Sequence, residues 1–326
     1  MDLDVVFLGT SASMPSAQRG AAAFLVRRGG DRLLFDCGEG TQRQLLRSAV
    51  GLVELREIFL THYHADHFGG LPFMLKSFAL RGRELPLTIY GPPGLADLVS
   101  ALRRVFGRLS YEVELVEVRP GDRFERDEYR LETFAVSHGV HGVGWMLLEE
   151  PRPGRFDVEA ADALGVEPRQ RGDLQRGGSV TTLDGRVVTP DLVLGPARAG
   201  RKLVLTGDTA PAQSVIEAAA GADLLVHEAT FGDEEQERAQ ETLHSTATQA
   251  AVVARAAGVG MLALTHLSPR YFGPELAREA QSVFAETVVP KDFDVIEVPF
   301  PERGPAQLIK GGALQRRDEP VSSAAQ

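Results

Sequence analysis

Three histidines and one aspartate lie within six positions of one another, directly after an apolar run: they are His62, His64, Asp66 and His67. So many cationic or easily ionised groups repel one another unless a metal ion or an anion gathers them. His62 and His64 alternate out of the strand end toward one side, whereas Asp66 and His67 begin the next turn and can face a second point nearby. The spacing therefore predicts ligands for two metal ions rather than one.

Three more candidate ligands each follow an apolar run closely: they are His138, Asp208 and His266. The carboxyl ends of strands are where open α/β sheets assemble their sites, so these side chains are expected to meet the histidine run. His141 lies three residues after His138 and offers the same ligand type. Spacing alone does not choose between these two histidines.

A framework of strands and helices must position these side chains. Short runs of Val, Leu, Ile and Phe bounded by Gly, Pro or Asp predict buried strands at 5–8, 33–35, 58–60, 204–205, 224–226 and 261–264. A helical period predicts helices at 41–49, 71–80, 95–106, 246–257 and 275–285. Ser245 is the expected N-cap of the fourth helix. Strands mixed with helices along the whole length indicate an α/β layered domain.

Composition narrows the class of protein further. The 326 residues include 45 acidic and 35 basic ones, and the net charge of −10 excludes a generally basic protein that coats nucleic acid. The single cysteine, Cys37, excludes disulfides within the chain and Cys-rich zinc fingers, so any metal must be held by His and carboxylates. Two acids in the first four residues, and no apolar run of about 18 residues, predict a cytoplasmic protein without a membrane segment.

One segment, Pro151 to Lys202, differs from the rest in composition. Gly and Pro account for 13 of its 52 residues, against 53 of 326 for the chain, and Phe156 is its only aromatic residue. Such a stretch is expected to bury little apolar surface, which favours a solvated insertion, although long insertions are often functional. Its charge is +2, which leaves −12 on the remainder. A frayed tail is expected from about residue 314 to the end.

The histidine run resembles the signature of the metallo-β-lactamase superfamily, and its setting resembles the ribonuclease Z family of tRNA 3′-processing endonucleases in its short form. Segments similar to that family extend nearly from end to end, and besides the histidine run they are Phe7 to Thr10, Phe35 to Gln42, Gly207 to Thr209, His227 to Phe231, His244 to Thr246 and Thr265 to Tyr271. The resemblance implies a four-layer αββα fold over residues 1–326. It also implies that the Pro151 to Lys202 insertion is a protruding, flexible arm that binds tRNA.

The resemblance assigns seven metal ligands and two zinc ions. Its ligands are His62, His64 and His138 for one ion and Asp66, His67 and His266 for the other, with Asp208 bridging. It selects His138 over His141, because the third-motif histidine of the family lies six residues before the Gly of a Gly-aromatic pair, here Gly144-Trp145. Ligands of this kind, with an open position, are typical of catalytic rather than structural zinc.

The resemblance also implies a reaction. A hydroxide that bridges the two zinc ions would attack the phosphodiester of precursor tRNA and leave a 3′-hydroxyl on the tRNA, with Asp66 taking the proton of the attacking water. His244 would be the acid for the leaving oxygen, and Glu228 would orient it. From the residues alone, Glu228 and His227 are equally well explained as a buried polar pair. A homodimer is expected as well.

Some residues carry other interpretations. The Gly38 to Thr41 turn lacks the Lys and the spacing of a phosphate-binding loop and is expected to be a tight turn beside the metals. Cys37 and Trp145 are expected to be core residues. In the first loop only Pro15 and Arg19 match the family, and the Gly-Pro pair that is usual near the tip of the arm is not evident, with Pro168 to Gly172 in about that place.

Two other functions compete with this one. The first is another hydrolase of the superfamily, acting on small phosphodiesters or lactones. The second is a non-catalytic RNA-binding subunit on a decayed hydrolase fold. The second ranks lower because all seven ligand positions are filled.

Overall fold

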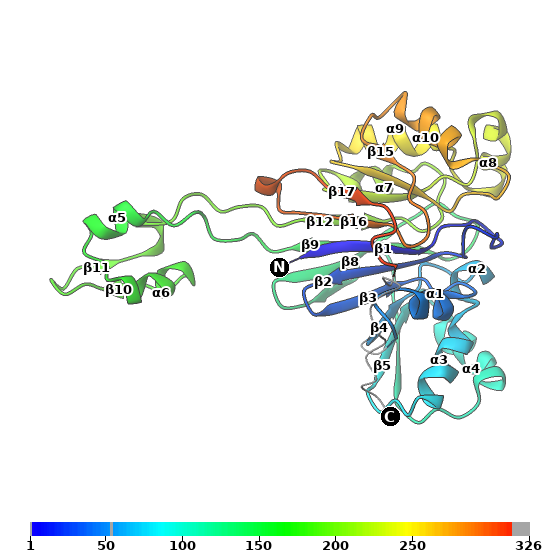
Figure 1. The fold of residues 1–326 in the computed structure, drawn as a ribbon, viewed down its shortest axis with the longest axis horizontal. Coiled ribbons are helices and arrows are strands. Elements are labelled where there is room, and N and C mark those ends of the chain that lie inside the picture. Colours follow the sequence, from blue (N-terminus) through cyan, green and yellow to red (C-terminus); the bar gives the residue numbers. More distant parts are fainter. Residues whose placement is uncertain (1, 53–54, 315–326) are drawn as a thin grey trace.

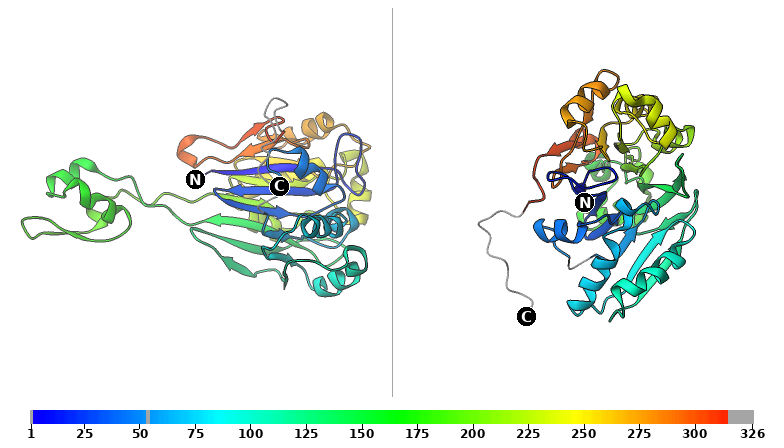
Figure 2. Two further views of the ribbon diagram at one scale, coloured as in Figure 1. Left: turned by 60° about the horizontal axis from the view of Figure 1, so that its bottom comes forward. Right: turned by 90° about the vertical axis from the view of Figure 1, so that its right-hand side faces the viewer.

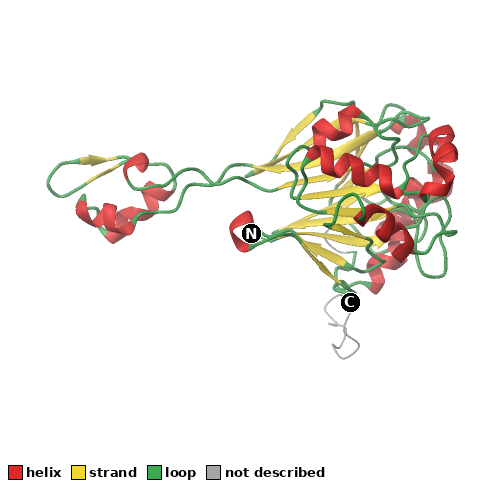
Figure 3. Ribbon diagram, turned by 90° about the horizontal axis from the view of Figure 1, so that it is seen from above, coloured by secondary structure: helices red, strands yellow, loops and turns green. Residues whose placement is uncertain are grey.

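The computed structural model describes residues 2–52 and 55–314, so most of the expected C-terminal tail lies outside the described residues. Two β-sheets pack face to face, and helices cover the outer face of each, which gives the expected four-layer αββα order (Figure 1). One unit, made by the Pro151 to Lys202 insertion, protrudes far from this body, as Figure 1, the left-hand view of Figure 2 and Figure 3 show.

The first sheet has the strand order β17-β16-β1-β2-β3-β4-β5-β6. Its strands are β1 (Leu3–Gly9), β2 (Ala23–Arg28), β3 (Asp31–Phe35), β4 (Glu57–Phe59), β5 (Leu87–Gly91), β6 (Val113–Glu117), β16 (Val295–Glu297) and β17 (Gln307–Ile309). Strands β3 to β6 are parallel, so the residues that follow them lie at one edge of the sheet. The helices of this half are α1 (Thr41–Arg47), α2 (Ala65–Phe68), α3 (Leu71–Leu80) and α4 (Leu95–Phe106).

The second sheet has the order β15-β14-β13-β12-β9-β8-β7. Its strands are β7 (Arg123–Glu125), β8 (Tyr129–Ala135), β9 (Val143–Glu149), β12 (Lys202–Leu205), β13 (Leu224–Glu228), β14 (Leu262–Thr265) and β15 (Thr287–Val288). Strands β12 to β15 are parallel, which again sends their carboxyl ends to one edge. The helices of this half are α7 (Gln213–Ala219), α8 (Gln236–Thr242), α9 (Ala247–Ala257) and α10 (Gly273–Gln281), with short 3₁₀ turns at η3 (Asp233–Glu235) and η4 (Pro301–Arg303).

Successive side chains along a strand point to opposite faces of its sheet, so the apolar side chains pack either between the two sheets or between a sheet and its helices. In β1, Val5 and Phe7 face the second sheet, whereas Val6 and Leu8 face the helices. Trp145 is fully buried between the sheets beside Phe59, as expected for a core residue. The indole of Trp145 packs against both sheets and so helps to hold them together. Replacing Trp145 with Ala would destabilise the fold by about 3–5 kcal/mol.

Three helices differ from the prediction at their ends. Helix α1 ends at Arg47 rather than at residue 49. Helix α9 is capped by Thr246 rather than Ser245, because the Thr246 hydroxyl accepts from the Gln249 amide while the Gln249 side chain accepts from the Thr246 amide. The Ser245 hydroxyl instead donates to the Thr209 carbonyl. Helix α10 begins and ends earlier than predicted, at Gly273 and Gln281, and carries a proline in its first turn.

The inserted segment has its own small fold. It contains α5 (Val158–Ala163), η1 (Pro168–Gln170), α6 (Arg171–Gln175), β10 (Val180–Thr181), β11 (Val187–Val188) and η2 (Pro190–Leu192). These pack around six buried apolar residues, which are Ala161, Val166, Leu174, Val180, Val188 and Val193. The expectation that this stretch buries little apolar surface is therefore wrong, because these aliphatic residues form a small core, against which the half-buried Phe156 packs.

The two ends of the insertion leave the body side by side. Arg152 and Arg198 exchange both backbone hydrogen bonds, at 2.8 and 2.9 Å. Both guanidinium groups also bind the carboxylate of Glu302 in η4, and Arg152 lies over the Phe300 ring. The insertion is thus closed at its root and fastened to the C-terminal part of the first sheet.

The positive charge of the insertion lies at this root and not in the protruding unit. Residues 153–197 contain five basic and seven acidic residues. Four of the five arginines there form ion pairs with acids of the same unit: Arg169 with Glu167, Arg171 with Asp162, Arg176 with Asp173 and Arg186 with Asp184. The +2 of the whole segment therefore does not mark a cationic tip, and counting charges along the sequence overstates the attraction of the protruding unit for phosphate.

Candidate metal centre

The predicted ligands meet at the seam between the two sheets. The histidine run follows β4 of the first sheet, whereas His138, Asp208 and His266 follow β8, β12 and β14 of the second. Asp208 is the centre of the group, and its Oδ2 atom lies 3.6 Å from His62 Nε2, 3.3 Å from His67 Nε2, 3.4 Å from His266 Nε2 and 4.0 Å from His138 Nε2. One carboxylate thus faces ligand atoms from both sheets.

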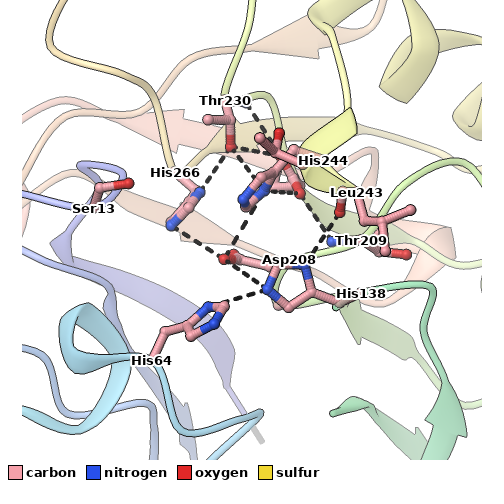
Figure 4. A network of polar contacts seen from close by, with 12 residues as sticks. Ser13, His64, His138, Asp208, Thr209, Thr230, Leu243, His244 and His266 are labelled. Carbon is pink, nitrogen blue, oxygen red and sulfur yellow. Dashed lines mark hydrogen bonds and ion pairs between the residues drawn. The ribbon is translucent and has the colours of Figure 1, made fainter. Parts of the chain in front are cut away.

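The seven side chains form two groups on either side of Asp208. One group is His62, His64, His138 and Asp208, and the other is Asp66, His67 and His266, with the ligand atoms of each group within 4.8 Å of one another. His64 joins through Nδ1, which lies 3.1 Å from His138 Nε2 (Figure 4). His141 is exposed and belongs to neither group.

Hydrogen bonds on the outer side of the cluster orient the rings. His67 Nδ1 lies 2.7 Å from Asp36 Oδ2. His266 Nδ1 lies 2.9 Å from the Thr230 hydroxyl, and His138 Nδ1 lies 3.1 Å from the Leu243 carbonyl (Figure 4). A partner on Nδ1 fixes the ring and leaves Nε2 as the free ligand atom. These three rings therefore present Nε2 toward the cluster.

The donor set fits metal ions. His62 Nε2 and Asp208 Oδ1 are buried, and neither has a hydrogen-bond partner in the described part of the chain. Two ring nitrogens, His67 Nε2 and His266 Nε2, point at one another 3.3 Å apart. Buried polar atoms are normally paired, so unpaired nitrogen and oxygen atoms aimed at one point indicate ligands for a cation.

The charges of the cluster suit this chemistry at neutral pH. Burial would raise the pKa of Asp208, but the surrounding histidines His266 and His67 outweigh burial and hold the pKa well below its usual range. The pKa of Asp66 is lowered in the same way, because the hydrogen bond from His266 and attraction to His67 outweigh burial. Burial and neighbouring histidines lower the pKa of His62. Ionised carboxylates and a neutral imidazole are the forms that bind metal. His67 differs, because attraction to Asp208 and Asp36 outweighs burial and holds the pKa of this ring well above its usual range, so His67 must release a proton when a cation binds.

His244 and Glu228 form a separate pair beside this cluster. His244 Nδ1 lies 2.7 Å from Glu228 Oε1, and burial of His244 is outweighed by attraction to that carboxylate, which raises the histidine pKa to about 9. Glu228 is fully buried and also accepts from the backbone amides of Thr209, Thr230 and Ser245. The arrangement holds a protonated imidazole in one orientation, which is the form of a general acid.

His244 also lies near the metal ligands. Its Nδ1 atom is 4.0 Å from Asp208 Oδ2, and with Asp208 and His266 it makes a third group that could hold an ion. The same Nδ1 atom is already bound to Glu228 at the shorter distance. The geometry therefore favours the acid pair over a third ligand group.

Two residues of the site have no counterpart among the sequence predictions. Asp36 accepts from the Thr61 amide at 2.8 Å as well as binding His67, and Thr230 lies between Glu228 and His266. Asp36 directly follows β3, just as the histidine run closely follows β4. The rule that acids at the ends of parallel strands enter the site would have found it.

The turn that precedes α1 approaches the metal ligands closely. A Cβ atom on Gly38 would lie 2.2 Å from the Asp66 carbonyl oxygen, and Gly40 has a φ of 82°. Only glycine fits both positions without strain. The segment is thus a tight turn, as expected, and it lies against the backbone of the candidate ligand Asp66.

Two further candidates lie outside the cluster. Cys37 is fully buried, and burial raises the pKa of its thiol to about 12, so it is a core residue and not a ligand. His227 is fully buried as well, and its Nδ1 lies 2.8 Å from the Glu228 carbonyl oxygen. Burial lowers the pKa of His227, which makes it a neutral neighbour of the acid pair.

The first loop covers the edge of the site. The Ser13 amide donates to Asp66 Oδ2 at 2.7 Å, which places the loop against a metal ligand. Arg19 points away from the site, because its Nη1 donates to the Thr10 hydroxyl and to the Pro290 carbonyl. The cation of this loop therefore anchors the loop to the body.

Comparisons with known proteins agree with this geometry. The family model described as the metallo-beta-lactamase superfamily matches residues 17–266. A protein of Methanosarcina acetivorans named ribonuclease Z is 40% identical over 301 residues, which is 91% of this chain and 99% of that protein. A ribonuclease Z of Myxococcus xanthus is 46% identical over 271 residues, 82% of this chain and 88% of the relative. Among solved structures, the short form of human tRNase Z has a TM-score of 0.67 at 28% identity and covers 91% of this chain and 99% of its own.

Proposed function

The chain belongs to the ribonuclease Z family of the metallo-β-lactamase superfamily, and from this membership we infer that it is a metal-dependent endoribonuclease that processes the 3′ ends of tRNA. Two features of the site, taken together, support this inference from the residues of the chain itself. One is a carboxylate, Asp208, that faces two groups of ligands, and the other is the His244 and Glu228 pair beside them.

We propose that the seven clustered side chains hold two zinc ions per chain. Bound there, the ions would supply a hydroxide as nucleophile and neutralise charge on the phosphate. The support is the donor set, which is His nitrogen and carboxylate oxygen without a thiolate, and the two buried ligand atoms that lack other partners.

The protein side chains then move the protons. The Asp66 carboxylate takes the proton of the attacking water, and the His244 imidazolium gives its proton to O3′ of the tRNA as the bond from phosphorus to O3′ breaks. Glu228 stabilises the charged imidazole before this transfer. The products are a tRNA that ends in a 3′-hydroxyl and a trailer that carries a 5′-phosphate.

The remaining parts of the proposal concern the assembly. We propose precursor tRNA as the substrate, the protruding insertion as a contact for it, a homodimer as the working form and the cytoplasm as the location. The free and buried Cys37 is compatible with a reducing compartment. In the described residues, no helix combines the length and the apolar character that crossing a membrane demands.

The central experiment is incubation of the purified protein with a 3′-extended precursor tRNA, with and without a chelator. Cleavage at the end of the acceptor stem, a 3′-hydroxyl on the tRNA and loss of activity with the chelator are expected. A metal content near one ion per chain in the fully active protein would exclude the two-ion mechanism.

A matched pair of variants tests the ligand assignment. His138→Ala removes a nitrogen that lies 3.1 Å from His64 Nδ1 and should abolish cleavage, whereas His141→Ala removes an exposed side chain and should leave most of it. Metal content measured on the same preparations should fall only in the first variant. Equal losses of activity in both variants would contradict the choice of His138.

The alternative function is hydrolysis of small phosphodiesters or lactones at the same metal centre. The chemistry of the cluster would be shared, and the difference lies in substrate size. Cleavage of a small phosphodiester together with inertness toward precursor tRNA would favour the alternative.

A further inference from the structure

The outer helices of the first sheet carry a concentration of positive charge. Between Leu71 and Glu112 there are six basic and three acidic residues, in a chain whose net charge is −10. The basic residues are Lys76, Arg81, Arg83, Arg103, Arg104 and Arg108. Apart from Arg83, which binds backbone carbonyls of Leu85 and Pro86, none of these has a side-chain hydrogen bond or ion pair within the described ranges.

Three of these cations form a continuous strip across α3 and α4. Lys76 and Arg108 line one shallow hollow, and Arg103 and Arg108 line a second one that adjoins it. Among the residues that the structure describes, no acidic one lines either hollow. Unpaired cations without neighbouring carboxylates produce a positive potential that attracts phosphate groups.

Apolar side chains are interleaved with this strip. Phe73 is 60% exposed and Leu80 is 75% exposed, and with Lys76 between them they follow one face of α3 at spacings of three and four residues. Leu80 lines the same hollow as Lys76. Exposed aromatic and apolar groups beside cations are the combination that binds single-stranded nucleic acid, because bases stack on the one and phosphates approach the other.

The strip is close in sequence to the candidate metal ligands. Helix α3 begins four residues after the candidate ligand His67, and its ten residues span about 15 Å. Phosphates along one strand of a duplex recur about every 3.4 Å, so this length corresponds to roughly four nucleotides. A strand that leaves the metals along α3 reaches the cations within a few nucleotides.

We propose that the face formed by Phe73, Lys76, Leu80, Arg103 and Arg108 binds the single-stranded 3′ trailer of the precursor. This inference rests on the proposed function, and it adds the position of the part of the substrate that is cut away. The face is separate from the protruding insertion, which leaves the body at the other end of the molecule (Figures 1 and 2). The arginines of that insertion are mostly paired with acids, whereas those of this face are not.

A second copy of the chain is a poorer occupant for this face. A two-fold contact through it would bring Lys76, Arg103 and Arg108 of one protomer near the same residues of its partner. The hollows supply no carboxylate to offset that repulsion. A polyanion meets the same cations with attraction.

The test compares two precursors that differ only in trailer length, one nucleotide against about twelve. The variant Lys76→Gln, Arg103→Gln, Arg108→Gln keeps an unbranched polar side chain at each position, although a shorter one, and removes three charges. We expect its KM for the long trailer to rise about tenfold and its cleavage of the one-nucleotide trailer to stay unchanged. The slope of log affinity against log salt for the long trailer should become shallower by about two, since each single-strand phosphate contact contributes about 0.7.

The matched control is Arg255→Gln, Arg278→Gln, Arg303→Gln, which removes the same charge from exposed positions on α9, α10 and η4. It should leave KM for both precursors unchanged. Equal losses on the long and short trailers, equal losses in the control variant, or an unchanged KM in the first variant would each overturn the trailer path. Failure of the wild-type protein to cleave either precursor would instead overturn the proposed function.

Discussion

At the scale of single residues, the contact between His244 and Glu228 gives the sharpest prediction. His244→Ala should lower the single-turnover rate of tRNA cleavage by about 10²–10⁴, because the leaving oxygen loses its proton donor. The metal content should stay at the wild-type value, since Nδ1 of His244 is held by Glu228 and not by the ligand group. A variant that loses an ion with its activity would make His244 a ligand.

Asp292 gives a prediction about stability and pH. Its carboxylate accepts from the Thr10 hydroxyl, the Gly20 amide and the Gln44 side chain, yet burial outweighs these contacts and raises its pKa to about 6. The unfolded value is near 4, so between about pH 4 and 6 the folded state binds more protons and its stability falls as pH rises. The loss is on the order of 3 kcal/mol.

The measurement is urea unfolding of the wild-type protein and of Asp292→Asn at several pH values from 4 to 7.5. The difference in unfolding free energy between the two proteins should change across pH 4 to 6 and be constant above it. A difference that does not depend on pH would show that Asp292 ionises normally in the folded protein.

The residue scale also shows how far sequence reasoning reaches. The types and spacing of the histidine run predicted a metal site, because few other arrangements gather so many ionisable groups. The spacing of the residues could not decide between His138 and His141 as the ligand, because the answer depends on how the chain turns after β8. Asp36 and Thr230 were not predicted as site residues, because a single acidic or hydroxyl residue forms no recognisable sequence pattern.

At the scale of elements, the protruding unit can be removed without touching the sheets. Because Arg152 and Arg198 are already paired through their backbones, a short Gly-Gly turn can replace 153–197. We expect this variant to show a greatly raised KM for precursor tRNA and an unchanged rate on bis(p-nitrophenyl) phosphate. Because the unit has no net positive charge, its shape must provide the contact with tRNA. The dependence of tRNA affinity on salt concentration should therefore change little in the shortened variant.

The control keeps the unit and loosens its root. Glu302→Gln removes the carboxylate that joins Arg152 and Arg198 while leaving residues 153–197 intact. Its KM should lie between those of the wild-type and shortened proteins. Unchanged tRNA cleavage by a folded, shortened protein would show that the insertion is a surface excursion without a role in binding.

Elements were predicted well where periodicity is strong and less well where tertiary contacts decide. Helices α3 and α4 have the predicted ends, since their apolar faces and flanking glycines agree. The N-cap of α9 moved by one residue because Ser245 is used elsewhere, by the Thr209 carbonyl. The core of the insertion was missed because its valines and alanines lie too far apart in sequence to form a periodic pattern.

At the scale of the whole molecule, the candidate ligands join the two sheets. The histidine run belongs to the first sheet, and His138, Asp208 and His266 belong to the second. Ions that bind only the folded protein stabilise it in proportion to the logarithm of their concentration over Kd. Removal of metal with a chelator should therefore lower Tm by several degrees.

Calorimetry with and without chelator measures this shift. His141→Ala should show the same shift as the wild-type protein, and His138→Ala should show a smaller one because one ion is already lost. Identical shifts in wild type and His138→Ala would place the stabilising ion elsewhere in the chain.

The separation of the ligands along the chain also sets an order in time. His67 and His266 present nitrogens 3.3 Å apart, although their positions in the chain differ by 199. At about 5–20 residues per second, a ribosome needs roughly 10 to 40 s to make that stretch. During this interval the nascent protein exposes a three-histidine run with no second sheet to complete the coordination. Correct loading is therefore a late event in the life of each molecule, and a chain that stalls before residue 266 carries an open site that any soft or borderline cation in the cell can enter.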